Sequence, residues 1–249
     1  MTDDASLPAP APVPAPPSRL RARLTALLEV IICSGYPTQL FVLAALASAG
    51  LVPATAQGRF SAAFIATLSL ADAALLITII MILLVSRGER PARVFLGLRS
   101  IVPEALRGVL LVPVSFLVAV VVLTLVRLAA PGLHNVAVNP LEQMLHSARD
   151  RLLAALVVII AGGVREEIQR AFILHRFEQS LGGATLGLVL FSLAFGAGHL
   201  EQGRDVAVAT ATLGAFWGIV YLRRRSIIAP AVAHAGFNLS EIIRQAVGH

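Results

Sequence analysis

The sequence predicts an all-α polytopic membrane protein, a bundle of about seven transmembrane helices. Hydrophobic residues make up 57% of the 249 residues and charged residues only 14%, whereas about a quarter of the residues in a soluble domain are charged. The apolar residues also gather in runs close to the roughly 20 residues that cross a bilayer as a helix. They lack the strict alternation of a membrane β-strand. These observations disfavour a soluble enzyme and a disordered protein.

The net charge of +6 does not indicate a nucleic-acid partner. Lysine is absent, so all 20 basic residues are arginines, and they are scattered between the apolar runs. Arginines placed in this way are typical of topology signals in membrane proteins. Cys33 is the single cysteine, so no disulfide framework can form. We therefore expect membrane lipids, and no nucleic acid, among the partners.

The chain divides by composition before any motif is considered. Residues 1–18 hold six prolines among alanines and are expected to form a disordered tail. Residues 19–149 are expected to form membrane helices that carry no motif. A longer loop is expected at Pro131–Arg151, with Leu141–Arg151 beginning a helix at the membrane surface. The expected spans are Leu24–Leu46, Ser61–Val85, Gly108–Leu128, Leu152–Phe177, Gly183–Leu200, Val206–Leu222 and Ile227–Val247. The first of them is expected to be kinked at Pro37.

The arginines predict the orientation of these spans. Twelve fall on one side of the membrane: Arg19, Arg21, Arg23, Arg87, Arg90, Arg93, Arg99, Arg107, Arg176, Arg223, Arg224 and Arg225. Six fall on the other side: Arg59, Arg127, Arg149, Arg151, Arg204 and Arg244. Because arginine is enriched in cytoplasmic loops, the N-terminus is predicted to be cytoplasmic and the C-terminus external. We expect a multi-pass protein of a bacterial plasma membrane.

Ionisable residues inside a bilayer are costly and mark candidate sites. Three groups stand out, namely the pair Glu166 and Glu167, His199, and His234 with Asn238. Adjacent helix positions are about 100° apart, so the two carboxylates are expected to face different directions.

The spacing around these groups defines possible partners. Arg170 can reach either glutamate, and His234 and Asn238, four positions apart, share a helix face. The alternatives are a solvated helix end, a histidine bonded to a backbone carbonyl, and an interhelical hydrogen-bonded pair. Asp72 stands alone in the second span and has no assigned role.

Together these residue types suit hydrolysis by water. A glutamate can take a proton from water that a histidine positions, and a second histidine and an asparagine can donate to a developing oxyanion. Glu166, His199 and His234 could instead hold Zn²⁺, although no HExxH motif occurs. The cofactor is therefore either Zn²⁺ or none.

The three motifs resemble those of the CAAX protease and bacteriocin-processing (CPBP) family of intramembrane proteases. This family includes the CAAX prenyl protease and lysostaphin resistance protein A-like proteins. Phe195 with His199, and His234 with Asn238, match its second and third motifs. Its first motif is Glu-Glu-x-x-x-Arg; here Arg170 arrives one residue early and Ala171 stands at the arginine position. The resemblance covers about residues 150–247, so residues 150–249 are predicted to form the catalytic membrane domain.

The resemblance implies an intramembrane endopeptidase, a hydrolase whose metal dependence is disputed within the family. Glu166 would be the main catalytic carboxylate and His199 would act with it on the water. His234 and Asn238 would complete the site, and Glu167 and Arg170 would support it. A peptide or protein substrate would enter from the membrane.

Two other classes of function remain open. One is a non-catalytic scaffold or bacteriocin-immunity protein, which the same family name covers. The other is a transporter or proton relay, because glutamate and histidine on membrane helices also serve that purpose. A prenylated CAAX substrate rests on family analogy alone.

Overall fold

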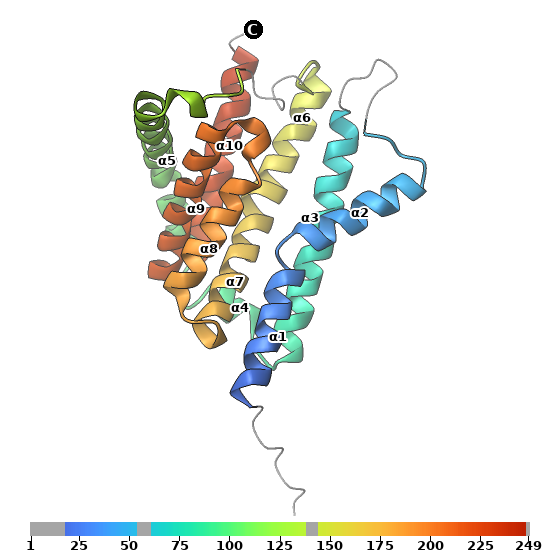
Figure 1. Ribbon diagram of the computed structural model, residues 1–249, viewed down its shortest axis with the longest axis vertical. Helices are drawn as coiled ribbons and strands as arrows, with labels where there is room; N and C mark the ends of the chain where they lie inside the picture. Colours follow the sequence, from blue (N-terminus) through green and yellow to red (C-terminus); the bar gives the residue numbers. More distant parts are fainter. Residues whose placement is uncertain (1–17, 54–60, 138–143, 248–249) are drawn as a thin grey trace, which may run out of the picture.

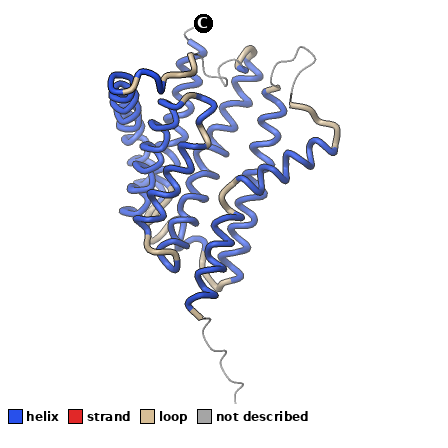
Figure 2. Tube along the Cα trace, viewed as in Figure 1, coloured by secondary structure: helices blue, strands red, loops and turns tan. Residues whose placement is uncertain are grey.

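The computed structural model describes residues 18–53, 61–137 and 144–247, and all regular structure among them is helical (Figures 1 and 2). The predicted tail therefore lies outside the described residues except for Ser18. The helices are α1 (Arg19–Ile32), α2 (Tyr36–Ser48), α3 (Ala62–Ser86), α4 (Pro91–Phe95), α5 (Ile101–Ala129), α6 (Ala148–Val157), α7 (Glu166–Ser180), α8 (Ala184–Ala197), α9 (Arg204–Arg224) and α10 (Ile228–Val247). Between them lie the short 3-10 turns η1 (Pro131–Leu133) and η4 (Leu200–Gln202) and a π-helical segment, η3 (Val158–Arg165). The all-α fold class is confirmed.

The predicted count of seven spans is not confirmed. Among the described residues, α3, α5 and α9 are each long and apolar enough to cross a membrane, and α1 with α2 adds a fourth if the bent pair is one span. The predicted span Gly183–Leu200 is shorter in the structure, because α8 has only 14 residues. The charged side chains of α7 and α10 lower the hydropathy of those helices.

The first predicted span is broken rather than gently kinked. α1 and α2 meet at 43°, and the chain between them passes through Gly35 with a φ of +92°. This left-handed conformation costs glycine little. Pro37 lies in the first turn of α2, where its missing N–H would have no helical partner in any case. The break therefore precedes the proline.

The segment that carries the glutamate pair is one continuous helical rod, from α6 through η3 to α7. The rod begins at Ala148, after a capping box between Ser147 and Asp150. This start is seven residues after Leu141, whose own position lies outside the described residues. η3 contains Gly162 and Gly163, and a Cβ added at Gly163 would lie 2.6 Å from the Cβ of Ala235. The absence of that side chain lets α10 pack closely against η3 just before the glutamates.

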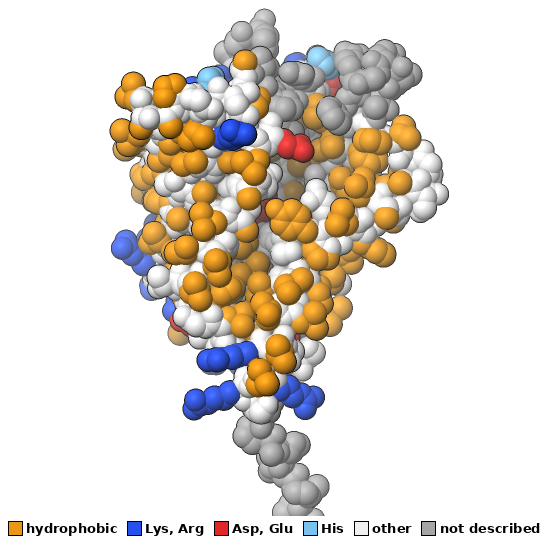
Figure 3. Space-filling model, in the orientation of Figure 1, with side chains coloured by type: hydrophobic (Ala, Val, Ile, Leu, Met, Phe, Trp, Pro, Cys, Tyr) orange, Lys and Arg blue, Asp and Glu red, His pale blue; other side chains and the backbone are white. Residues whose placement is uncertain are grey.

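Packing around this rod places the candidate residues together. α10 packs against η3 and α5, α8 packs against α7 and α9, and α1 packs against α7 (Figure 1). Arginines gather where α1 begins (Figure 3). Arg99 donates to the Arg224 carbonyl oxygen at that end of the bundle. The cytoplasmic location of this end remains a prediction.

Candidate active site

The two glutamates open α7 and lie in different surroundings. The Glu167 side chain is 1% exposed and receives hydrogen bonds from Arg170 and from Nδ1 of His234, the latter at 3.0 Å. The Glu166 side chain is 21% exposed, and its Oε2 lies 3.7 Å from Nε2 of His234, beyond normal hydrogen-bond length. Glu167 is therefore held by two partners, whereas Glu166 has no hydrogen bond to another described side chain.

Arg170 compensates the charge of Glu167 inside the protein. It is fully buried, and its guanidinium lies 5.1 to 5.9 Å from the ring centroids of Phe191, Phe195 and Trp217. Aromatic faces stabilise a desolvated cation. A solvated helix end is therefore the wrong interpretation of this segment, because Glu167, Arg170 and the later Arg176 are all buried.

His234 is fixed by contacts on two sides. Its ring stacks on Trp217 with the centroids 3.8 Å apart and the planes 19° apart, while its Nδ1 faces the Glu167 carboxylate. A carboxylate accepts a hydrogen bond, so Nδ1 carries a proton and Nε2 faces Glu166. Sequence reasoning missed Trp217, because a tryptophan in an apolar span looks like any other core aromatic.

His199 was expected inside the span Gly183–Leu200. In the structure it lies in the turn between the end of α8 and the start of η4. Nδ1 of its ring lies 2.8 Å from the carbonyl oxygen of Phe195, so this nitrogen is the donor. The ring also packs on Phe195, with the centroids 5.0 Å apart. Nε2 is the remaining nitrogen that can act on a bound molecule.

Asn238 follows His234 by one turn of α10 and lies against Gly162 of η3. A Cβ added at Gly162 would be 2.8 Å from Nδ2 of Asn238. The glycine therefore leaves the space that the asparagine amide occupies. π-helical turns such as η3 are frequent at functional sites.

Four of the candidate side chains line one cavity of about 520 Å³: Glu166, His199, His234 and Asn238. Its remaining walls come from α3, α5, α6, α8, α9, α10 and the π-helical segment, and many of them are apolar. Glu167 and Arg170 lie behind this wall and contact it through His234 and Phe195. The structure thus brings the four residues together, and their catalytic roles remain predictions.

The three candidate metal ligands do not form a metal site in this arrangement. No group of three His, Cys, Asp or Glu side chains in the described parts of the chain has the geometry to hold a metal ion. Nδ1 of His234 faces Glu167 and Nδ1 of His199 faces a carbonyl oxygen. Of the two ring nitrogens of each histidine, this leaves Nε2 as the one that could serve as a ligand.

Asp72, which had no assigned role, is the partner of Arg165. Its Oδ2 accepts a hydrogen bond from Nη2 of Arg165 at 2.6 Å, and Nη1 of Arg165 donates to Gln169. Gln169 in turn donates to the carbonyl oxygen of Cys33 at 2.8 Å. This chain of bonds ties α3 and the break between α1 and α2 to the start of α7. No short-range pattern could pair residues 93 positions apart.

The fold and the site together place this protein among helical membrane proteins whose cavity is lined by carboxylate, imidazole and amide groups. Within it, residues 148–240 match the family model described as type II CAAX prenyl endopeptidase Rce1-like, which confirms the predicted resemblance. The matched segment contains every candidate residue of the site. No curated protein and no solved structure gave a match to the chain. The apolar helices indicate a membrane protein, and the matched segment is similar to a family of endopeptidases.

Proposed function

We propose that this protein is an intramembrane endopeptidase in which Glu166 activates the attacking water. The observation that carries the proposal is the contrast within the glutamate pair. Glu167 is buried and compensated by Arg170, whereas Glu166 lines the cavity and has no partner within hydrogen-bond length among the described residues. The match to an endopeptidase family supports the same reaction.

The attack begins with a water shared by Glu166 and a histidine. Oε2 of Glu166 and Nε2 of His234 are 3.7 Å apart, so one water beside the line between them can bind both atoms. The water oxygen attacks the carbonyl carbon of the peptide bond, and its proton passes to Glu166. Nε2 of His199, on the wall of the same cavity, orients the water or the peptide.

The negative charge then develops on the former carbonyl oxygen. Asn238 lines the cavity and can donate Nδ2–H to this oxygen, while Glu167 holds His234 in place through Nδ1. The C–N bond breaks as Glu166 returns its proton to the leaving nitrogen. The products are a carboxylic acid and an amine, and the site returns to its starting state.

The substrate in this proposal is a peptide segment that enters from the membrane. The cavity has the size of a ligand-binding pocket, and its apolar walls suit membrane-derived chains. Prenylated peptides belong in the test because the matched family is named for them.

The test is hydrolysis in heavy-oxygen water by the purified, detergent-solubilised protein. Prenylated and unmodified peptide mixtures are incubated with the wild type, with Glu166→Gln and with Glu178→Gln as a matched control at an exposed ion pair. We expect heavy oxygen in the new carboxyl groups with the wild type and the control only. A scaffold would give no labelled product with any variant. A transporter would also give none and would instead move solutes across liposomes.

A further inference from the structure

A second cavity of about 510 Å³ lies beside the first. Its walls come from the break between α1 and α2, from α3, α7 and α8, and from part of η3. The surface is hollowed between α2 and α8 in the space-filling view (Figure 3). The mechanism above assigns no part of the substrate to this cavity.

The two cavities meet at the candidate catalytic groups. Five residues belong to the walls of both: Ser69, Ala161, Glu166, Phe195 and His199. Ser69 and Ala161 have small side chains, and these leave room for a peptide main chain at the junction. A bond placed at Glu166 and His199 would therefore have space on both sides.

Unpaired polar atoms in the wall of the second cavity indicate what it could bind. Oδ1 of Asp72 and Nε of Arg165 are buried and have no hydrogen-bond partner among the described residues, while Oδ2 and Nη2 of the same side chains bind each other. Gln39 and Gln169 line the same cavity. Together these four side chains give the wall both acceptors and donors, the groups that pair with the N–H and C=O of an extended peptide.

We propose that the two cavities are the two halves of one substrate path, with the peptide on one side of the cleaved bond in the first and on the other side in the second. This inference rests on the proposed function and extends it. The protein would cut internal bonds and not terminal ones. The N-terminal half, which carries no motif, would supply part of the substrate-binding wall through Asp72 and the α1–α2 break.

Photocrosslinking tests the path directly. A photoreactive amino acid replaces Ala194, which lines only the second cavity, or Thr210, which lines only the first. Leu193 and Val208, exposed neighbours that line neither cavity, are the matched controls. In the Glu166→Gln background, a biotinylated mixture of randomised peptides should crosslink at both test positions several times more than at the controls. On a peptide that the wild type cleaves, the two crosslinks should map to opposite sides of the cut. Crosslinks on the same side, or an Ala194 signal no higher than that of Leu193, would overturn the path.

Closing the junction provides a second measurement. Ser69→Leu fills the space between the cavities, and Thr67→Leu places the same side chain on the exposed face of α3. Ser69→Leu should slow cleavage by roughly 10²-fold, because about 1 Å of misplacement can cost that much. It should also abolish the crosslink at Ala194 while the one at Thr210 persists. Wild-type cleavage by Ser69→Leu would count against the inference.

The two proposals fail in different ways. Crosslinks at both positions without any cleavage by the wild type would leave the peptide path standing and overturn the proposed endopeptidase. Cleavage accompanied by crosslinks from Thr210 alone would leave the endopeptidase standing and overturn the path. Cleavage confined to terminal residues would overturn both proposals, because an endopeptidase and a two-sided path each require cleavage of internal bonds.

Discussion

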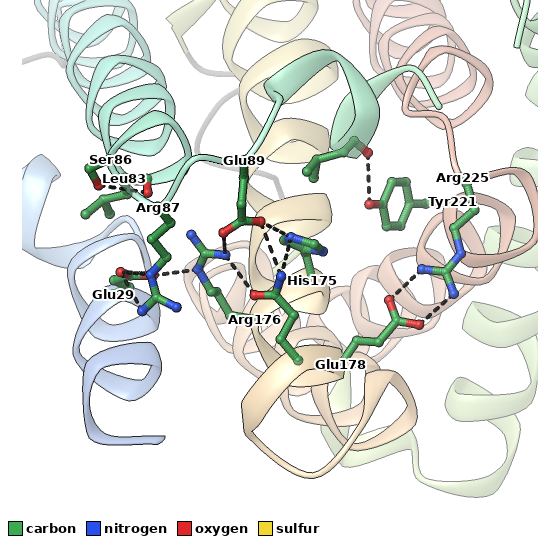
Figure 4. A network of polar contacts seen from close by, with 12 residues as sticks. Glu29, Leu83, Ser86, Arg87, Glu89, His175, Arg176, Glu178, Tyr221 and Arg225 are labelled. Atoms are coloured by element: carbon green, nitrogen blue, oxygen red, sulfur yellow. Dashed lines mark hydrogen bonds and ion pairs between the residues drawn. The ribbon is translucent and has the colours of Figure 1, made fainter. Parts of the chain in front are cut away.

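The two ends of α7 carry the same kinds of side chain in different settings. At its start, Glu167, Arg170 and His234 are in contact beside the cavity. Towards its end, Glu89, His175 and Arg176 make a similar cluster, which also takes in Glu29, Arg87 and Gln179 (Figure 4). Both clusters pair a buried arginine with carboxylates and a histidine.

The difference lies in the pairing of the second carboxylate and in the cavity beside it. Glu29 and Glu89 both bind Arg176, and each has a further partner, in Arg87 or His175. Glu166 instead faces open space next to the compensated cluster. The same residue types therefore form a structural clamp between α1, α3 and α7 at one end of α7. At the other end they hold His234 beside the unpaired carboxylate of Glu166. Residue type alone does not distinguish a reactive cluster from a structural one.

The strongest test of this contrast substitutes one carboxylate from each setting. Glu166→Gln should lower the rate of peptide cleavage by about 10²–10⁴-fold, the usual cost of losing a general base, without lowering the melting temperature. Glu89→Gln should lower the melting temperature and retain most activity per folded molecule. Activity assays and thermal melts on purified variants measure both. If Glu166→Gln stays active while Glu167→Gln is inactive and equally stable, the roles of the two adjacent carboxylates are reversed.

Substitution of either buried arginine should lower the stability of the protein by a similar amount, but only one of the two substitutions should lower its activity. Removing one partner of a buried ion pair costs about 3–5 kcal/mol, so Arg170→Met and Arg176→Met should both unfold at lower denaturant concentration. Only Arg170→Met should also lower the activity of the molecules that remain folded. Without Arg170, His234 is the one remaining hydrogen-bond partner of Glu167 among those described above, and the position of its ring in the site changes. Equal activity per folded molecule in the two variants would show that the first cluster is merely structural.

The oxyanion donor gives a smaller and more local effect. Asn238→Ala should slow cleavage by about 10²–10³-fold, the typical cost of one such donor, with little change in stability. Gly162→Ala should slow it less, because the added methyl pushes the Asn238 amide without removing it. Gly163→Ala is the control: its methyl meets Ala235 and should cost stability first. Kinetics and melts of the three variants separate these effects, and an active Asn238→Ala would remove the amide from the mechanism.

The sequence was sufficient for what depends on composition and local spacing. Apolar runs predicted the helical fold and the ends of α3, α9 and α10 to within a few residues, and helical periodicity placed Glu166 and Glu167 in different directions. It was not sufficient for what depends on tertiary contacts. Asp72 pairs with Arg165 across 93 positions, and the position of His199 beyond α8 depends on where that helix ends. Long apolar runs also overstate the spans, because a helix such as α8 can be apolar and still too short.

The smallest expected effect concerns the pH dependence of the structural cluster. Burial alone would raise the pKa of Glu89, but hydrogen bonds from His175 and Arg176 outweigh it and hold this pKa below its usual value. A lowered carboxyl pKa adds stability above the unfolded pKa of about 4.3, and this stability is lost as the pH falls below it. The melting temperature of the wild type should therefore exceed that of Glu89→Gln at neutral pH, and the gap should close as the pH approaches the lowered pKa. Glu178→Gln removes a more exposed pair with Arg225, worth at most about 1 kcal/mol, and should give a smaller gap. A Glu89→Gln gap that is independent of pH would mean that the carboxylate charge does not stabilise the clamp, and that the geometry of the hydrogen bonds holds this end of α7 in place.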